Sequence, residues 1–178
     1  KEVKSMSTFV LHQGSCVNER VDCIVNAANR YLQAGGGVCG AIFSKAGHRE
    51  LQKACDGFDI PLKDGQAVLT PSFHLSNCKA IIHAVGPNFS LTPSAYQALY
   101  DAYYSALLVM KDNDFHSVAF PLISSGIFGG NLHHPSRISY TYARRAYDDF
   151  VKAYPAYSVE MRICAFSESE YNEIVQGE

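Results

Sequence analysis

Residues 23–42 read CIVNAANRYLQAGGGVCGAI, and this stretch decides the class of fold. The apolar run Cys23-Ile24-Val25 predicts a short buried strand, which a polar segment at residues 26–29 follows. Three consecutive glycines, residues 35–37, come next. After them, apolar residues recur at helical spacing as far as residue 55, which predicts helix. A buried strand, a glycine-rich loop and a helix, in that order, are typical of an α/β protein.

The rest of the chain continues this alternation. Apolar runs predict further strands at residues 7–13, 67–70, 80–85, 118–120 and 159–166. Thr92-Pro93 predicts the start of a helix that reaches Met110, and a second long helix is expected over residues 134–154. Ser167 and Glu170 have the spacing of a capping box for a last helix. We therefore expect an α/β fold in three layers (α/β/α), with helices on both faces of a central mixed, largely parallel sheet.

Size and charge limit the class of protein. The chain has 178 residues, 47% of them hydrophobic and 18% charged, with a formal net charge of -2. This length fits one domain, residues 1–178, and the hydrophobic content excludes a disordered chain. A nucleic-acid partner is not favoured, because there is no surplus of Lys and Arg. No apolar run is long enough to span a membrane, so we expect no membrane partner. We expect a monomer.

The six cysteines do not form a recognisable metal or redox motif. None of them is spaced as Cys-x-x-Cys, and the histidines show no metal-ligand spacing, so we expect no metal and no cofactor. With no signal peptide visible, free thiols indicate a reducing compartment, and we expect a cytoplasmic protein. The six are Cys16, Cys23, Cys39, Cys55, Cys78 and Cys164.

Three polar or glycine-rich segments follow predicted strands, and the carboxyl ends of parallel strands are where α/β sheets bind ligands. They are residues 26–37, His83-Ala84-Val85-Gly86-Pro87 and Ser124-Ser125-Gly126-Ile127-Phe128-Gly129-Gly130. Glycines let the backbone approach a ligand and present its N–H groups, and a helix N-terminus favours an anion. Two such loops suit a diphosphate. The plainer alternative is that the glycines only make tight turns.

The glycine segment also fits the pattern G-x-G-x-x-G, over residues 35–40. A dinucleotide-binding turn follows its strand directly, whereas residues 27–34 intervene in this chain. No acidic residue ends a second strand about 20 residues later, where ribose recognition needs one. An NAD-dependent oxidoreductase is therefore disfavoured.

Four motifs, taken together, resemble the macro domain family in order and spacing, over nearly the whole chain. Macro domains bind ADP-ribose, and many remove it from proteins or deacetylate O-acetyl-ADP-ribose. Stand-alone bacterial proteins and domains of viral polyproteins carry such motifs. The motifs are Ile24-Val25-Asn26-Ala27-Ala28-Asn29, Gly35-Gly36-Gly37-Val38-Cys39-Gly40-Ala41-Ile42, Ile82-His83-Ala84-Val85-Gly86-Pro87 and Pro121-Leu122-Ile123-Ser124-Ser125-Gly126-Ile127-Phe128-Gly129.

The resemblance implies a role for each matching position. Asn29 would contact the distal ribose and serve as the catalytic residue, although an isolated Asn more often makes an Asx turn. Gly35, Gly36, Gly37 and Val38 would line the ribose and the diphosphate, and Ser125, Gly126, Ile127 and Phe128 would wrap the diphosphate. Ser15, Cys16 and Phe166 would lie at the adenine, although Phe166 also fits simple core packing.

Two positions depart from the family pattern. The family usually has an Asp after the first strand, where this chain has Ser15, and a neutral hydroxyl accepts a weaker hydrogen bond from adenine than a carboxylate does. The MacroD-type hydrolases that this chain resembles carry Asp and His where Cys39 and Phe43 stand. Those residues help to position or activate the attacking water, so that version of the mechanism is in doubt.

The leading hypothesis is an ADP-ribose-binding macro domain that hydrolyses mono-ADP-ribosyl protein esters or O-acetyl-ADP-ribose. A non-catalytic reader of ADP-ribose or of ADP-ribosylated proteins is the alternative. A third hypothesis makes Cys39 a nucleophile, because a helix N-terminus lowers the pKa of a thiol. His133 and His134 are further acid/base candidates, although such a pair is usually exposed.

Overall fold

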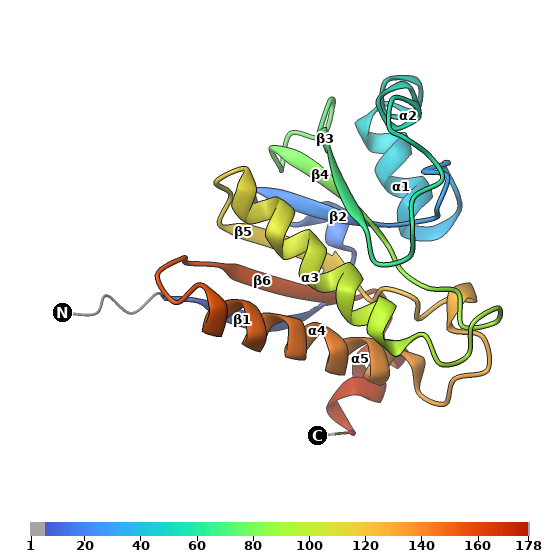
Figure 1. The fold of residues 1–178 in the computed structure, drawn as a ribbon, viewed down its shortest axis with the longest axis vertical. Helices are drawn as coiled ribbons and strands as arrows, with labels where there is room; N and C mark the ends of the chain where they lie inside the picture. Colours follow the sequence, from blue (N-terminus) through green and yellow to red (C-terminus); the bar gives the residue numbers. More distant parts are fainter. Residues whose placement is uncertain (1–5, 178) are drawn as a thin grey trace.

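A computed structural model of the chain describes residues 6–177, so residues 1–5 and 178 of the expected domain lie outside it. One sheet in this part of the chain has the strand order β1-β6-β5-β2-β4-β3. Neighbouring strands are parallel except for β3, which runs antiparallel to β4 (Figure 1). The predicted mixed, largely parallel sheet is confirmed. Its strands are β1 (Thr8–Gln13), β2 (Cys23–Ala28), β3 (Ala67–Pro71), β4 (Ala80–Val85), β5 (Ser117–Pro121) and β6 (Glu160–Ala165).

Helices cover both faces of this sheet, which confirms the three layers. One face carries α1 (Gly37–Ala46) and α2 (His48–Asp56), and the other carries α3 (Tyr96–Asp112) and α4 (Pro135–Ala153) (Figure 1). The last helix, α5 (Glu168–Val175), packs against α4 and the edge formed by β1 and β6. It begins with the predicted capping box of Ser167 and Glu170.

Two predicted helices have different boundaries in the structure. The stretch after the glycines is broken at Gly47, whose φ of 107° interrupts the helix and separates α1 from α2. The helix expected from Thr92-Pro93 begins only at Tyr96. The reason is a preceding turn, in which the N–H of Thr92 donates to the carbonyl of Asn88 at 3.0 Å. The apolar pattern therefore missed the break at Gly47, and the Thr92-Pro93 signal placed the start of α3 too early.

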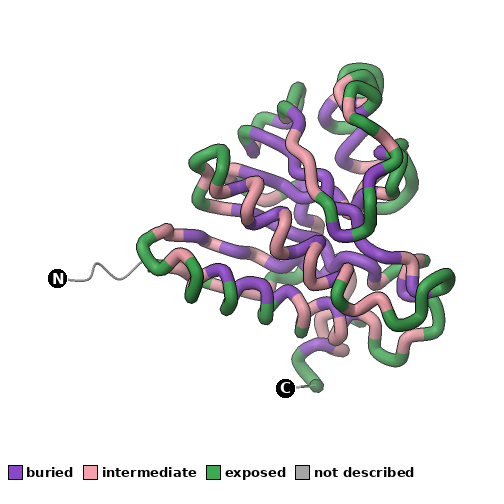
Figure 2. The backbone as a smooth tube through the Cα atoms, in the orientation of Figure 1, coloured by how far each residue is buried: buried purple, intermediate pink, exposed green. Residues whose placement is uncertain are grey.

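The second strand is longer than its apolar run. β2 continues to Ala28 because it pairs with β4 along its whole length, so Asn26 lies opposite His83 inside the sheet. Alternate β2 side chains enter separate cores: Cys23 and Val25 face α3 and α4, whereas Ile24 faces α1 and α2. All six residues of β4 are buried, as expected for a strand that helices cover on both faces (Figure 2).

A histidine inside the sheet ties three strands together. His83 is fully buried, with Nδ1 3.0 Å from Nδ2 of Asn26 and Nε2 3.0 Å from Oγ1 of Thr70. Because an amide nitrogen only donates, Nδ1 is the acceptor, and Nε2 carries the proton and donates to Thr70. Burial lowers the pKa of His83 from 6.5 to about 4. The ring is therefore neutral at pH 7 and links β2, β3 and β4.

This histidine makes the stability of the protein depend on pH. Between pH 6.5 and 4 the unfolded chain binds a proton at this position that the folded protein does not, so stability falls as the pH falls. We expect His83 to cost about 3 kcal/mol of unfolding free energy between pH 7 and pH 4. Urea unfolding of the wild type and of His83→Gln, which keeps a donor and an acceptor, measures the difference. Identical pH profiles would contradict the assignment.

Candidate functional site

A cavity of about 640 Å³ opens at the carboxyl ends of β1, β2, β5 and β6. Its position follows from the sheet. β2 pairs with β4 at all six positions but with β5 only at Cys23 and Ile24, so β2 and β5 separate toward their carboxyl ends. The connections on the two sides of β2 also use opposite faces of the sheet. The chain leaves β2 for α1 and α2 on one face, and it reaches β5 from α3 on the other face. Such switch points are where α/β sheets bind ligands.

All the residues expected to bind a ligand line this one cavity. They come from the segments after four strands and from the start of α1. These residues are Ser15, Cys16, Asn29, Gly35, Gly36, Gly37, Val38, Ser125, Gly126, Ile127, Phe128 and Phe166.

Sequence reasoning missed several other lining residues. Pro121, Leu122 and Ser124 belong to the last of the four motifs and directly precede Ser125, and this adjacency is a signal that would have found them. Cys164 and Glu170 carry no such signal, because only the pairing of β6 and the start of α5 bring them to the cavity. The remaining lining residues are Gly14, Ala27, Cys39 and Ala41.

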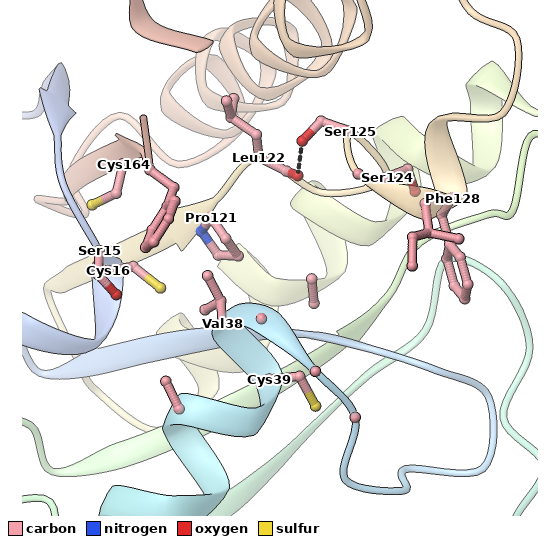
Figure 3. A pocket seen from close by; sticks show the side chains of 18 of the residues that line it. Ser15, Cys16, Val38, Cys39, Pro121, Leu122, Ser124, Ser125, Phe128 and Cys164 are labelled. Atoms are coloured by element: carbon pink, nitrogen blue, oxygen red, sulfur yellow. Dashed lines mark hydrogen bonds between the residues drawn. The ribbon is translucent and has the colours of Figure 1, made fainter. Parts of the chain in front are cut away.

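The residues that line the cavity lie on either side of the start of α1. Ser15, Cys16 and Cys164 lie at one end, and Ser125 and Phe128 lie at the other (Figure 3). Val38, at the start of α1, stands between them. The site therefore suits an extended ligand whose parts meet different surfaces.

The first loop presents backbone donors at the N-terminus of α1. Gly37 has a φ of 58°, the left-handed region that favours glycine, where the loop turns into the helix. A Cβ on Gly40 would lie 2.6 Å from the carbonyl oxygen of Gly35, so the helix can approach the loop only without a side chain there. Within residues 6–177, the N–H groups of residues 36–39 donate to no protein acceptor. They are free to bind an anion.

The second loop is held from behind and also presents donors. Ser124 has a φ of 59°, and its hydroxyl donates to the carbonyl of Pro87 at 2.7 Å. The hydroxyl of Ser125 donates to the carbonyl of Leu122 at 2.7 Å (Figure 3). In the described part of the chain, the N–H groups of residues 126–128 have no protein acceptor. This loop is a second anion site that faces the same cavity.

A buried hydroxyl pair fixes the start of the second loop. Oγ of Ser139 donates to the carbonyl of Ile123 at 2.5 Å, so the hydroxyl of Tyr103 donates to Ser139 at 2.6 Å. The Tyr103 oxygen in turn accepts the N–H of Ile123 at 3.0 Å. Because Tyr103 belongs to α3 and Ser139 to α4, both helices position the loop.

The side chain of Asn29 is largely engaged by its own loop. Its Oδ1 accepts the N–H groups of Tyr31 and Gln33 at 3.1 Å each, and its Nδ2 donates to the carbonyl of Gln33 at 2.9 Å. The turn that a lone Asn favours is therefore present. One N–H of the amide is left over, so Asn29 can offer a ligand a single donor.

The thiols that line the cavity are poor nucleophiles. Burial raises the pKa of Cys39, in the direction opposite to the lowering that the sequence led us to expect. Burial also raises the pKa of Cys16 to about 12 and raises that of Cys164. His48 is exposed on α2, and His83 is enclosed by the sheet and α1, so neither lines the cavity with Cys39. A Cys–His pair is absent from the part of the site that the structure describes.

The remaining candidates lie elsewhere. His133 and His134 are exposed and do not line the cavity. Phe43, at the position of the family's His, is buried in the core against the rings of His48 and His83. Among the described residues, no group of three or more His, Cys, Asp or Glu could hold a metal ion, and no helix is long and apolar enough to cross a membrane.

Comparison with known proteins gives concordant results. The model of the Macro domain family matches residues 25–138. An O-acetyl-ADP-ribose deacetylase of Salmonella gallinarum is 39% identical over 152 residues, which cover 80% of this chain and 78% of that protein. The Oceanobacillus iheyensis macrodomain with ADP superposes with a TM-score of 0.82 at 32% identity, over 94% of this chain and 88% of that one. The Trypanosoma brucei macrodomain in complex with ADP-ribose gives 0.79 at 29% identity, over 95% and 68%.

We expect Cys39 to be alkylated slowly at neutral pH. Its raised pKa leaves the thiol protonated, so labelling by iodoacetamide should keep accelerating above pH 9. Mass spectrometry measures the rate at which the peptide that carries Cys39 is alkylated. The Cys39→Ser variant, which lacks this thiol, identifies that peptide. Rapid labelling of Cys39 at pH 7 would restore the hypothesis of a cysteine nucleophile.

Proposed function

The chain belongs to the macro domain family, and on that premise we propose that it binds ADP-ribose and hydrolyses mono-ADP-ribosyl protein esters or O-acetyl-ADP-ribose. One observation carries the proposal: two loops with free backbone N–H groups face a single cavity. Preorganised donors of this kind bind a diphosphate without basic side chains. The names of the similar proteins, which refer to ADP-ribose and to its O-acetyl ester, support this choice of ligand.

The proposed ligand follows the long direction of the cavity. Its diphosphate lies between residues 35–38 and 125–128. Its adenine lies at the end formed by Ser15, Cys16 and Phe166, and its distal ribose lies beside Asn29. The volume of about 640 Å³ is in the usual range for such ligands, about 300–1,000 Å³.

The chemistry rests on positioning more than on side-chain acids and bases. The free N–H of Asn29 donates to a hydroxyl of the distal ribose and orients the ligand relative to the attacking water. An oxygen of the ligand's own diphosphate, held by the two loops, accepts a proton from that water. The water oxygen then attacks the ester, and the released acid or ribose hydroxyl takes up the proton. Substrate geometry thus replaces the Asp and His of the MacroD-type enzymes, where this chain has Cys39 and Phe43.

The presence of Cys39 and Phe43, where the MacroD-type enzymes have Asp and His, supports a second candidate function. Glu170 is the one carboxylate that lines the described cavity, and it follows β6 at the end proposed for adenine. A site with no acid or base near the distal ribose suits a non-catalytic reader of ADP-ribose or of ADP-ribosylated proteins. Product release distinguishes a reader from an enzyme.

We further propose that residues 1–178 act as one domain, as a monomer, in the cytoplasm. One chain forms every wall of the cavity, so the site does not need a second copy. The six cysteines are free, as a reducing compartment would keep them.

Calorimetry tests the diphosphate site. ADP-ribose and ADP should bind at least about tenfold more tightly than AMP, because AMP cannot bridge both loops. Equal affinities for AMP and ADP would contradict a diphosphate held between the two loops.

Substitution of Asn29 tests the enzyme proposal. Asn29→Ala should lower turnover of a mono-ADP-ribosylated protein about 100-fold, the usual cost of losing a positioned donor, and should change ADP-ribose affinity by less than about threefold. Asn29→Asp is the companion variant: it keeps the acceptor for the N–H groups of Tyr31 and Gln33 but loses both amide donors, to the carbonyl of Gln33 and to the ligand, so its unfolding free energy is measured beside its turnover. We expect it to be equally slow.

Two results would count against catalysis by Asn29. An equal loss of binding and turnover in Asn29→Ala would make it a binding residue only. Binding of ADP-ribose by the wild type, with no product released from either ester, would establish the reader instead.

A further inference from the structure

Two residues that follow β6, the exposed Phe166 and Glu170, both line the cavity, and Glu170 is the one carboxylate among the described residues that does so. We propose that Glu170 is a specificity-determining residue that selects a nucleobase with an exocyclic amino group, and so selects adenine. This inference rests on the proposed binding of ADP-ribose. It assigns the recognition of adenine to Glu170, which lies far in the sequence from Ser15, the residue at the position of the family's Asp.

The carboxylate of Glu170 is held in place by the start of α5. Its Oε2 accepts the N–H of Ser167 at 3.1 Å, and Oγ of Ser167 accepts the N–H of Glu170 at 3.2 Å. This reciprocal cap uses one carboxylate oxygen. Among the described residues, Oε1 of Glu170 has no hydrogen-bond partner. A fixed side chain with one free acceptor is thus available to a ligand.

Phe166 gives this end of the cavity a flat apolar surface. Its side chain follows β6, lines the cavity and is 64% exposed, which is unusual for an aromatic residue at the end of a core strand. A planar ring against Phe166 would cover that surface. An aromatic face beside an acceptor-only carboxylate matches a heterocycle that carries N–H donors.

Ser15 cannot supply the same recognition. Its hydroxyl oxygen already accepts the N–H of Val17 at 3.4 Å, where it caps the short helix Cys16–Asn18, and it is neutral. Hydrogen bonds to an ionised acceptor are stronger than those to a neutral one. Glu170 lies in the first turn of α5, directly after the strand β6 that carries Cys164, and Cys164 lies with Ser15 on the side of the cavity away from Ser125 and Phe128 (Figure 3).

The chemistry of the base makes the inference specific. The amino group of adenine donates to Oε1 of Glu170. Hypoxanthine carries at that position a carbonyl oxygen, which only accepts, so it would face the carboxylate oxygen with no hydrogen between them. The protein should therefore prefer ADP-ribose to the otherwise identical inosine diphosphate ribose.

Calorimetry with these two ligands, on the full chain, tests the inference. The wild type should bind ADP-ribose at least about tenfold more tightly than inosine diphosphate ribose. Glu170→Gln should bind ADP-ribose about fivefold more weakly, because its amide oxygen stays in the cap with Ser167 and its NH2 group, which only donates, replaces the free acceptor. Its ratio of affinities should approach one, because the amide can donate to the oxygen of hypoxanthine. Gln also preserves the capping box, so the fold is kept.

Glu168→Gln is the matched control. Glu168 lies in the same first turn of α5, is exposed and does not line the cavity, so the variant makes the same change in charge without touching the ligand. We expect wild-type affinities for both ligands.

The outcomes separate the two proposals. If the wild type binds ADP-ribose and Glu170→Gln matches Glu168→Gln in both affinities, the role of Glu170 is overturned while the proposed function stands. If the wild type binds neither ligand, the proposed function fails and this inference fails with it.

Discussion

The separation of β2 from β5 is the constraint on which the site depends. The two strands pair only at their first residues, whereas β2 and β4 pair throughout, so the sheet divides at its carboxyl edge. Four loops converge on that division and line one cavity. Had β2 stayed paired with β5, the donors of the two glycine-rich loops would not face a common space.

Buried polar contacts hold this arrangement from both sides of the sheet. His83 joins β2 to β3 and β4 beneath α1, and Tyr103 with Ser139 fixes the start of the second loop from α3 and α4. The side chains of His83, Tyr103 and Ser139 do not line the cavity. They hold the strands and loops whose N–H groups face it. Buried contacts of this kind specify one geometry, and at His83 they also make stability depend on pH.

The electrostatics of the site come from the backbone more than from charged side chains. This is why a chain with a net charge of -2 can be proposed to bind a diphosphate. Ser15 and Cys39 stand where related proteins carry Asp. The loss of these carboxylates leaves the backbone N–H groups, and with them the proposed diphosphate site, in place. At the adenine end, the start of α5 offers a carboxylate from a different part of the chain.

The sequence by itself predicted the strands and the layers, because apolar period is a local property, and its resemblance to the family predicted many of the residues that line the cavity. It also predicted the capping box at Ser167, which is a contact over three residues. Only the tertiary structure decided that Asn26 lies inside β2, that burial raises the pKa of Cys39, and that Glu170 reaches the cavity. All three features depend on which distant segments pack together. The partner of a strand and the burial of a thiol are properties of the packed chain, so no short stretch of sequence encodes them.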